Sequence, residues 1–178
     1  MTDDSNIDRP RGSSTSATAT TVDPLTLRAV AGTFATGITI ISCSVDGMPH
    51  GCAANAVVSV SLDPPLMLIS LAETSRTRAA IQAAGSFAIN ILPDSPEGAE
   101  LCAVFAGRTV DKFEQATHDH GELGSPILRN ALGWLECAVE ATHVAGDHTL
   151  FIGRVVAAGH DIGEPLVFFR GRNRSLSV

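Results

Sequence analysis

Residues 146–155 read Gly146-Asp147-His148-Thr149-Leu150-Phe151-Ile152-Gly153-Arg154-Val155, and no other segment says more about the fold of this chain. From Thr149 onward the run is apolar and alternating, which predicts a β-strand. His148 then lies at the mouth of the strand, where Asp147 beside it is placed to orient the imidazole ring, as histidines in functional sites commonly are. By itself, a histidine at the start of a strand is more often a structural hydrogen-bonding group of a loop.

The same strand pattern recurs along the chain, with turn residues between the strands. The β-branched run 38–44 ends before Asp46-Gly47, a hairpin signal, and the chain resumes as a second strand over 50–60. Asp63-Pro64-Pro65 then breaks the chain before the next strand. Further strands are predicted over 66–71, 87–92, 132–141, 149–158 and 165–169.

Three short helices are predicted between and before these strands. Asp23-Pro24 places an N-cap residue before a proline at the first helical position, and Gly32 closes this helix. Residues 75–84 and 96–105 also have helical spacing. So few crossover helices disfavour a doubly wound parallel sheet, and no Gly-x-Gly-x-x-Gly fingerprint opens a helix. The sequence therefore predicts a mainly β fold with a few α-helices, in which antiparallel strands form a barrel.

Length, charge and composition narrow the class of protein. The 178 residues suit one compact domain, and the net charge of −7 argues against nucleic acid or an anionic membrane as partner. Residues 1–22 contain a small polar tract that cannot bury apolar area, so we expect a disordered tail before a folded domain over 23–178. Widely spread cysteines, no cleavable signal and no apolar run of roughly 18 residues predict a soluble cytoplasmic protein.

Hydroxyl groups and an arginine gather at the predicted start of the second helix. Ser75, Arg76 and Thr77 form, with Ser59, a candidate phosphate site, because hydroxyls, a guanidinium and the amides that open a helix all attract an anion. A helix N-cap followed by a surface arginine explains the residues of the helix start equally well, and both roles can coexist.

Seven short motifs follow one another along the chain. They are Phe34-Ala35-Thr36-Gly37-Ile38-Thr39-Ile40-Ile41, Asp46-Gly47-Met48-Pro49-His50-Gly51, Ala54-Asn55-Ala56, Ser59-Val60-Ser61-Leu62-Asp63-Pro64-Pro65-Leu66, Ser75-Arg76-Thr77, Asp111-Lys112-Phe113 and Gly146-Asp147-His148. In this combination, from about Leu25 to Arg172, the chain resembles the short-chain flavin reductases, the reductase components of two-component flavin-dependent monooxygenases. The resemblance implies an antiparallel FMN-binding split β-barrel of Greek-key type, a homodimer with the flavin near the subunit interface, and release of the reduced flavin to a partner monooxygenase.

The resemblance also implies cofactors and roles for individual residues. NADH or, in its place, NADPH would pass a hydride to FAD or FMN, with NADH and FAD preferred, so the site needs stacking geometry and hydrogen-bond donors rather than a nucleophile. The flavin-binding residues implied are Thr36, Gly37, Ala53, Ala54, Asn55, Ala56, Ser59, Ser75, Arg76 and Thr77. His148 is the candidate catalytic residue beside the nicotinamide, where we favour positioning over proton transfer, and Lys112, Phe113 and Arg170 are further candidate contacts.

Two alternatives to this function remain open at the level of sequence. A flavin-binding protein on the same barrel would store or sense flavin without reducing it, because a shared fold does not by itself determine activity. His148 and the Asp111-Lys112-Phe113 segment favour the enzyme, since a flavin carrier needs no nicotinamide site. A barrel acting on another phosphorylated cofactor fits the phosphate cluster but not the order of the motifs.

Four further features of the sequence bear on candidate ligand sites. His118-Asp119-His120 suggests a metal site, but third and fourth ligands are not evident, so we expect a solvated loop and no metal. The arginine-rich segment 170–174 lacks the interleaved aromatic residues of a nucleic-acid patch. Ala53 stands where family members often carry threonine, so one hydroxyl contact to the flavin is absent or replaced. Cys52 has no local partner cysteine or activating cation, and we expect a structural thiol.

Overall fold

The computed structural model describes residues 21–109 and 111–176. Within these ranges the helices are α1 (Pro24–Ala31), α2 (Arg76–Ala84), α3 (Pro96–Ala106) and the short 3-10 helix η1 (Lys112–Gln115). The strands are β1 (Thr36–Gly37), β2 (Thr39–Val45), β3 (Met48–Ala54), β4 (Val57–Leu62), β5 (Pro65–Ala72), β6 (Ser86–Ile91), β7 (His118–His120), β8 (Pro126–Leu128), β9 (Gly133–Ala145), β10 (His148–His160), β11 (Val167–Phe169) and β12 (Arg172–Arg174). The fold is mainly β, as the sequence predicts. The predicted disordered tail, residues 1–22, lies almost entirely outside the described residues.

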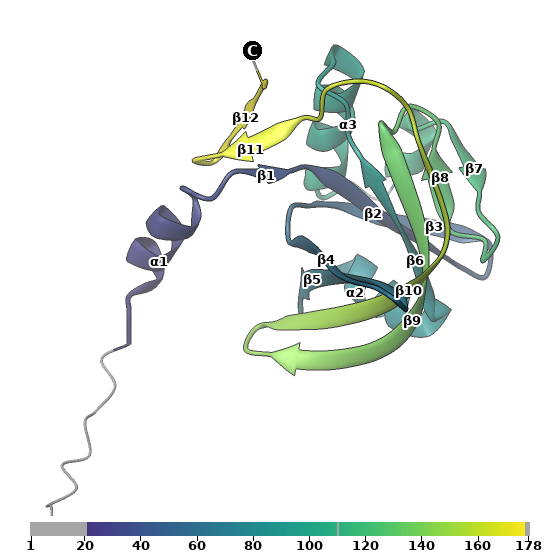
Figure 1. Ribbon diagram of the computed structural model, residues 1–178, viewed down its shortest axis with the longest axis horizontal. Helices are drawn as coiled ribbons and strands as arrows, with labels where there is room; N and C mark the ends of the chain where they lie inside the picture. The colour runs from purple at the N-terminus through teal and green to yellow at the C-terminus, as the bar shows by residue number, and fades with distance from the viewer. Residues whose placement is uncertain (1–20, 110, 177–178) are drawn as a thin grey trace, which may run out of the picture.

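One curved sheet of seven antiparallel strands dominates the molecule (Figure 1). Its order is β3-β2-β6-β9-β10-β5-β4, so β3 and β4 stand at opposite edges although only Asn55 and Ala56 separate them in the chain. The sheet must therefore bend round on itself to bring its two edges together at this connection. Among the strand ladders of the described residues none joins β3 to β4, so the sheet stays open between them.

Tight turns explain how neighbouring strands of the sheet are joined. Asp46 and Gly47 have φ angles of 52° and 78°, the left-handed geometry of a two-residue hairpin, and connect β2 to β3. Gly146, with φ of 65°, turns β9 into β10, which are both 13 residues long. The second hairpin carries Asp147 and His148 at its tip, as the sequence predicts for the start of that strand.

The predicted helix ends are confirmed. Asp23 caps α1 by accepting hydrogen bonds from two backbone amides, and Gly32 follows the last residue of that helix. Ser75 caps α2, and Gly85 ends it in the left-handed conformation with φ of 69°. No helix within the described residues is both long enough and apolar enough to cross a membrane.

Two apolar clusters make up the core, one on each side of β2. Ile41 packs with Phe87 and Phe151 in a cluster that α2 covers, whereas its neighbour Ile40 packs with Phe105 of α3 in the other. Successive residues of a strand point to opposite faces, so β2 is buried on both of them. This double burial requires a helix on each side and explains the positions of α2 and α3.

Some predicted strands are wrong in extent. The strand expected over 50–60 is two strands, because the chain leaves β2 after Ala54 and pairs again, from Val57, with β5 at the far edge of the sheet. His118-Asp119-His120 is not a loop but strand β7, which pairs with β8. The sequence does not predict β1, β8 and β12, because strands of two or three residues are too short to show an alternating pattern.

A smaller part of the molecule, which we call the arm, consists of α1 and the three-stranded sheet β1-β11-β12. Figure 1 shows α1 standing apart from the curved sheet. None of the α1 residues is buried, and Leu25, Leu27 and Val30 are 77%, 60% and 64% exposed. The contact that secures the end of α1 is backbone, since the Arg170 amide donates to the Gly32 carbonyl at 2.9 Å.

Candidate functional site

The end of β3 and strand β1 form one wall of a cavity. Asn55 Nδ2 donates to Thr36 Oγ1 at 3.1 Å, which ties the two segments together. These residues and Gly37 line a cavity of about 300 Å³ whose remaining lining is mostly apolar and includes Met67. Thr36 and Gly37 of β1 therefore share one surface with Asn55, which directly follows β3 and lies 18 or more positions further along the chain. All three are among the residues predicted to bind flavin.

The three alanines of this segment have different surroundings. Ala53 and Ala54 are neighbours on β3 and point to opposite faces, so Ala53 packs against the α3 cluster and Ala54 against the α2 cluster. Ala56 is exposed, and its carbonyl accepts a hydrogen bond from the Ser70 amide. Small side chains here keep the backbone close to the cavity, and Asn55 supplies the polar side chain.

The start of α2 collects three of the four residues of the predicted phosphate site. Ser75 is the N-cap, and Thr77 is buried with 4% of its surface exposed. Arg76 is held in place, since its Nη2 donates to the carbonyls of Arg108 and Thr109 at 2.9 and 3.2 Å. The cap, the guanidinium and the first amides of α2 together form a surface that favours an anion.

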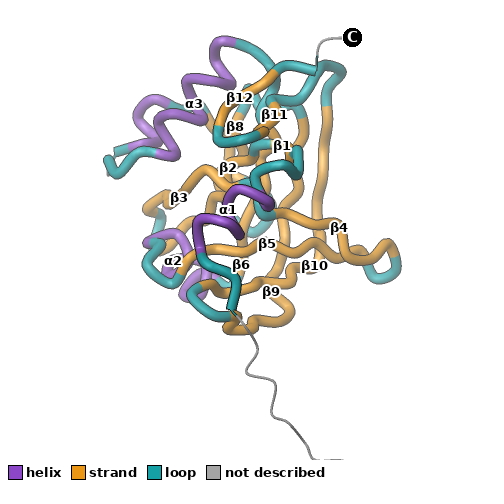
Figure 2. The backbone as a smooth tube through the Cα atoms, turned by 90° about the vertical axis from the view of Figure 1, so that its left-hand side faces the viewer, coloured by secondary structure: helices purple, strands orange, loops and turns teal. Residues whose placement is uncertain are grey.

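Ser59 is not part of this group within one chain. It pairs with Met67 on β5, and β5 runs on to Ala72 before the turn to α2, about 16 Å further along the strand. In Figure 2, β4 and α2 lie on opposite sides of the molecule. The structure thus brings Ser75, Arg76 and Thr77 together and leaves Ser59 on the exposed edge strand.

His148 is held by its neighbours at the tip of the β9–β10 hairpin. Its Nδ1 lies 2.7 Å from Asp147 Oδ1, and this hydrogen bond lowers the pKa of the Asp147 carboxyl. A carboxylate only accepts hydrogen bonds, so Nδ1 carries the proton and Nε2 is left for other contacts. Thr149 donates to the Glu73 carboxylate, and the Glu73 amide donates to the Asp147 carbonyl at 2.9 Å, which fixes the hairpin tip against the end of β5.

Lys112 and Phe113 are placed as supporting residues. Lys112 is 8% exposed, and its Nζ donates to the Phe105 carbonyl at 2.8 Å and to the Gly51 carbonyl at 3.4 Å. Burial, together with repulsion from Arg76, lowers the pKa of the Lys112 amine. The Phe113 ring meets the Phe105 ring edge to face at 5.0 Å. Both residues tie η1 to α3 and β3, and the charge of Lys112 adjoins Arg76.

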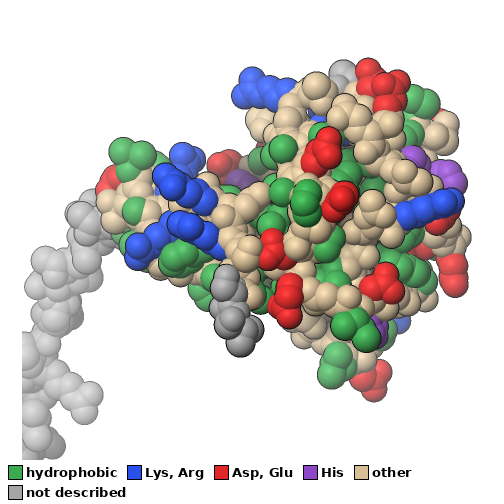
Figure 3. All heavy atoms as spheres, turned by 90° about the horizontal axis from the view of Figure 1, so that it is seen from above, with side chains coloured by type: hydrophobic (Ala, Val, Ile, Leu, Met, Phe, Trp, Pro, Cys, Tyr) green, Lys and Arg blue, Asp and Glu red, His purple; other side chains and the backbone are tan. Residues whose placement is uncertain are grey.

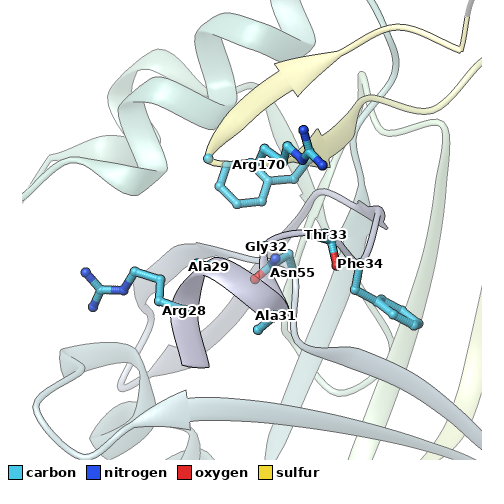
Figure 4. A pocket seen from close by; sticks show the side chains of 10 residues that line it. Arg28, Ala29, Ala31, Gly32, Thr33, Phe34, Asn55 and Arg170 are labelled. Atoms are coloured by element: carbon cyan, nitrogen blue, oxygen red, sulfur yellow. The ribbon is translucent and has the colours of Figure 1, made fainter. Parts of the chain in front are cut away.

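Arg170 lies in the arm, at the turn between β11 and β12. Its backbone is left-handed, with φ of 50°, and its guanidinium lies 5.2 Å from the centre of the Phe169 ring. It lines a second, larger cavity of about 770 Å³ between α1 and the β11–β12 turn (Figure 4). Arg28, Phe34 and Phe168 line the same cavity. The sequence predicts no role for these three residues, because segments far apart in the chain form the cavity and leave no local sequence pattern. Phe34 alone belongs to a sequence motif, of which it is the first residue.

The surroundings of the four cysteine thiols hold the pKa of each above its ordinary value. Burial raises the pKa of Cys43 and Cys137 to about 12, and it raises the pKa of Cys52 despite hydrogen bonds with Thr77 and Ser75 that act in the opposite direction. The four cysteines are unpaired. Across the described residues no three His, Cys, Asp or Glu side chains are grouped as a metal would require.

Residues 31–177 match the family model of the flavin reductase like domain. The chain belongs to this flavin reductase family. It is 40% identical over 155 residues to the reductase subunit HsaB of a flavin-dependent monooxygenase from Rhodococcus jostii, a match that covers 86% of this chain and 78% of that protein. It is 41% identical over 160 residues to an NADH-dependent flavin reductase from a Rhodococcus species, covering 88% of this chain and 89% of the relative.

Solved structures of flavin reductases have the same fold. The NADH:FAD oxidoreductase SgcE6 from Streptomyces globisporus, solved in complex with NAD and FAD fragments, superposes with a TM-score of 0.81 at 35% identity. The match covers 89% of this chain and 98% of that one. The open antiparallel sheet with its three helices is therefore the architecture of a flavin reductase.

Proposed function

We propose that this protein is an NADH-dependent flavin reductase that transfers a hydride to FAD or FMN and supplies the reduced flavin to a monooxygenase. The observation that carries the proposal is the convergence of Thr36, Gly37 and Asn55 on one cavity in a chain of the flavin reductase family. Relatives named as an NADH-dependent flavin reductase and as a monooxygenase reductase subunit support the reaction and the partner. An FMN reductase (NADH) and an NADH:FAD oxidoreductase among the similar proteins support both flavins.

The residues of the site fit a flavin mononucleotide moiety. The apolar cavity beside Asn55 suits a ring system that needs apolar contact and a few hydrogen bonds. Cys52, which contacts Ser75 and Thr77 at the start of α2, lies three residues before Asn55 on β3, about 10 Å along the strand. The ring would therefore lie against the cavity and the phosphate at the α2 N-terminus, with Ser75, Arg76 and Thr77 as its ligands.

The chain contributes orientation, while the bound flavin supplies the ring that accepts the hydride. The Ala56 carbonyl accepts a hydrogen bond from the Ser70 amide, and Ser70 pairs with Leu150 on β10. We call the surface formed by Thr36, Gly37 and Asn55 the flavin wall. His148 lies about two strand spacings across the sheet and two residues along it from this wall, roughly 12 Å away. A nicotinamide ring would lie over this part of the sheet. His148 would position the nicotinamide ring through Nε2 while Asp147 accepts a hydrogen bond from Nδ1. Lys112 and Phe113 would hold the backbone near the phosphate-binding residues in position. The small side chains of Ala53, Ala54 and Ala56 would let the backbone approach the flavin. The role of Ser59 in binding flavin remains a prediction.

The uncovered apolar surface of the arm supports a homodimer of split barrels. An eight-residue helix with no buried residue does not stabilise itself in water, because short isolated helices are marginal and most helix stability comes from packing. A second subunit packed on Leu27 and Val30 would cover this surface and add residues beside the flavin wall. The free cysteines and NADH as donor favour the reducing cytoplasm.

Anaerobic mixing of the purified protein with NADH and either FAD or FMN tests the function. We expect protein-dependent loss of the absorbance of oxidised flavin, faster with NADH than with NADPH, and the two flavins are ranked by rate. Admission of O2 together with a monooxygenase component and its organic substrate should then reoxidise the flavin, with O2 as the oxidant, and form hydroxylated product that O2 alone does not give.

A non-catalytic flavin-binding protein is the second candidate, and the same experiment separates the two. Flavin that binds, as seen by quenching of its fluorescence, yet is not reduced by either NADH or NADPH would establish the carrier. The fixed hydrogen bond between Asp147 and His148 favours the enzyme, because a flavin carrier has no use for an oriented imidazole at this distance.

A further inference from the structure

The β9–β10 hairpin extends beyond the other strands of the sheet. The ladder between β6 and β9 ends at Ala138, so in the described part of the chain residues 141–145 of β9 pair with β10 alone. On the other side of β10, the ladder with β5 ends where His148 lies opposite Ala72. Figure 1 shows the hairpin as the long pair of green strands that project from the sheet. Because a two-stranded ribbon is at best marginally stable by itself, the tip that carries His148 needs a further contact to hold a fixed position.

Glu73 provides that contact. It directly follows β5, and its backbone amide donates to the Asp147 carbonyl at 2.9 Å. Its carboxylate accepts a hydrogen bond from the Thr149 hydroxyl. The two bonds hold the residues immediately before and after His148, so the backbone of His148 is fixed from both sides.

The Glu73 carboxylate holds the hairpin tip on the face opposite to His148. Thr149 is buried, with 2% of its surface exposed, whereas 43% of the His148 side chain is exposed. Successive side chains of a strand point to opposite faces, so the carboxylate contacts one face of β10 and leaves the His148 face open. Glu73 can therefore position His148 without itself touching a ligand of that histidine.

The Glu73 carboxylate is in turn held by α2. Arg78 Nε lies 3.9 Å from Glu73 Oε2, and Arg78 Nη1 donates to Gln82 Oε1 at 2.8 Å on the same helix. On the face seen in Figure 3, by contrast, most Lys and Arg side chains lie toward the end that carries α1, while Asp and Glu are spread over the rest. Glu73 differs from such solvated carboxylates, because one of its oxygens accepts from a hydroxyl and the other lies near a guanidinium. It thereby joins the start of α2 to the hairpin.

The start of α2 thus contacts both parts of the proposed site. The proposed phosphate site begins at Ser75, two residues after Glu73, while Glu73 itself holds the tip that carries His148. We infer that Glu73 is a positioning residue for the hydride donor, which sets the place of His148 relative to the flavin phosphate through its two bonds to the hairpin tip. The inference rests on the proposed function and deepens it, because it assigns the residue that fixes the nicotinamide side of the site to the phosphate side.

Steady-state kinetics of flavin reduction tests the inference. Glu73→Ala removes the acceptor for Thr149, so the KM for NADH should rise about fivefold, the equivalent of one ordinary hydrogen bond, with little change in kcat. Thr149→Val removes the hydroxyl at nearly constant volume and should have the same effect, and the two changes combined should exceed neither alone. Glu73→Gln keeps a carbonyl oxygen that accepts from Thr149, so it should keep the KM within about twofold.

Two comparisons separate positioning from a general loss of stability. Glu140→Ala is the matched control, because the Glu140 side chain is 39% exposed against 40% for Glu73, and its carboxylate pairs with Arg154 at 3.0 Å within the same hairpin. We expect this control to leave the KM for NADH unchanged. In a His148→Ala background, Glu73→Ala should raise the KM no further, because the side chain that it positions is absent.

Hydrogen exchange of the hairpin tip tests the same contact without any nucleotide. The amides of residues 145–150 should exchange about fivefold faster in Glu73→Ala than in the unchanged protein. An unchanged KM for NADH in Glu73→Ala, an equal rise in Glu140→Ala, a further rise in the His148→Ala background, or unchanged exchange at the tip would each overturn the inference. Failure of the proposed function appears in the unchanged protein, as no reduction of flavin, whereas failure of the inference appears only in the comparison of the variants.

Discussion

The curved sheet and the arm differ in what they bury. In the sheet, Ile40, Ile41 and Phe87 are completely buried, and apolar clusters cover both faces of β2. In the arm, α1 has no buried residue and meets the rest of the chain mainly at its C-terminal end. Both regions border the candidate site, yet only the sheet is stabilised by its own core. The comparison indicates that the sheet supplies a rigid core, whereas the arm leaves apolar residues exposed, as the proposed contact with a second subunit requires.

Buried polar side chains of the sheet form hydrogen bonds within the fold, whereas the charged side chains of the arm are exposed. Asn90, fully buried, donates to Ser42 Oγ at 2.9 Å and accepts from the Leu128 amide at 2.8 Å, which joins β2, β6 and β8. Glu136, also fully buried, accepts from the Ser125 amide at 2.9 Å. These side chains satisfy buried groups and serve the fold, whereas the arginines of the arm are exposed.

The largest expected effect is on stability, from a methyl group added in the sheet. In Gly153→Ala the new Cβ would lie 2.6 Å from Phe87 Cζ and 2.7 Å from Cys137 Cβ, both in a fully buried cluster. We expect the free energy of unfolding, measured by urea denaturation, to fall by about 3 kcal/mol. Gly37→Ala in the arm sheet meets nothing within 4 Å and should change it by less than about 0.5 kcal/mol. Similar losses for both variants would erase the contrast between the two regions.

A smaller effect is expected on association, from changes in the arm. Leu27→Ser combined with Val30→Ser removes exposed apolar area from α1, so the dissociation constant of the proposed dimer should rise about a hundredfold, while the core of each subunit is unaffected. Sedimentation over a range of protein concentrations measures the change. Ile162→Ser, at an exposed residue outside the arm, is the control. A dimer that is unaltered by the double change would show that α1 is not at the interface.

At the hairpin tip a moderate effect on the donor is expected. His148→Ala should raise the KM for NADH about tenfold, the equivalent of one hydrogen bond, with little change in kcat, because the ring positions rather than transfers a proton. The pKa of the Asp147 carboxyl is lowered by its bond to His148, so this bond is present above that pKa and is lost as the pH falls through it. In the Asp147→Asn variant, the KM for NADH should therefore change less as the pH falls into the acid range. A fall in kcat alone in His148→Ala would point to proton transfer instead.

The smallest effect is expected for the core thiols. Burial raises the pKa of Cys43 and Cys137 from 9.0 to about 12, so neither forms thiolate near neutral pH. A thiol reagent at about pH 8 should leave both unmodified in the native protein and modify them after unfolding. Because the unfolded thiols ionise first, these two residues should also reduce stability as the pH rises from 9.0 toward 12. Rapid modification of the native protein at either position would contradict a rigid sheet core.

The sequence gives reliable boundaries where a short-range signal exists. Asp23 and Gly32 delimit α1, Ser75 and Gly85 delimit α2, and Asp46 with Gly47 marks the first hairpin, because caps and tight turns depend on a few adjacent residues. The prediction of a single strand over 50–60 was wrong for the opposite reason. Its residues favour an extended backbone throughout, and the break at Asn55 and Ala56 depends on which distant strand each half pairs with.

The site divides in the same way. The order of the motifs was sufficient for the family and the reaction, and the strand pattern was sufficient to place His148 beside Asp147 at the start of a strand. The separation of Ser59 from Ser75, the burial of Lys112 and the larger cavity lined by Arg28 depend instead on how the sheet curves and where the arm docks. Caps, turns and strand tendency are properties of neighbouring residues and can be read along the chain, whereas a cavity and a buried charge arise only when long-range packing brings separate segments together.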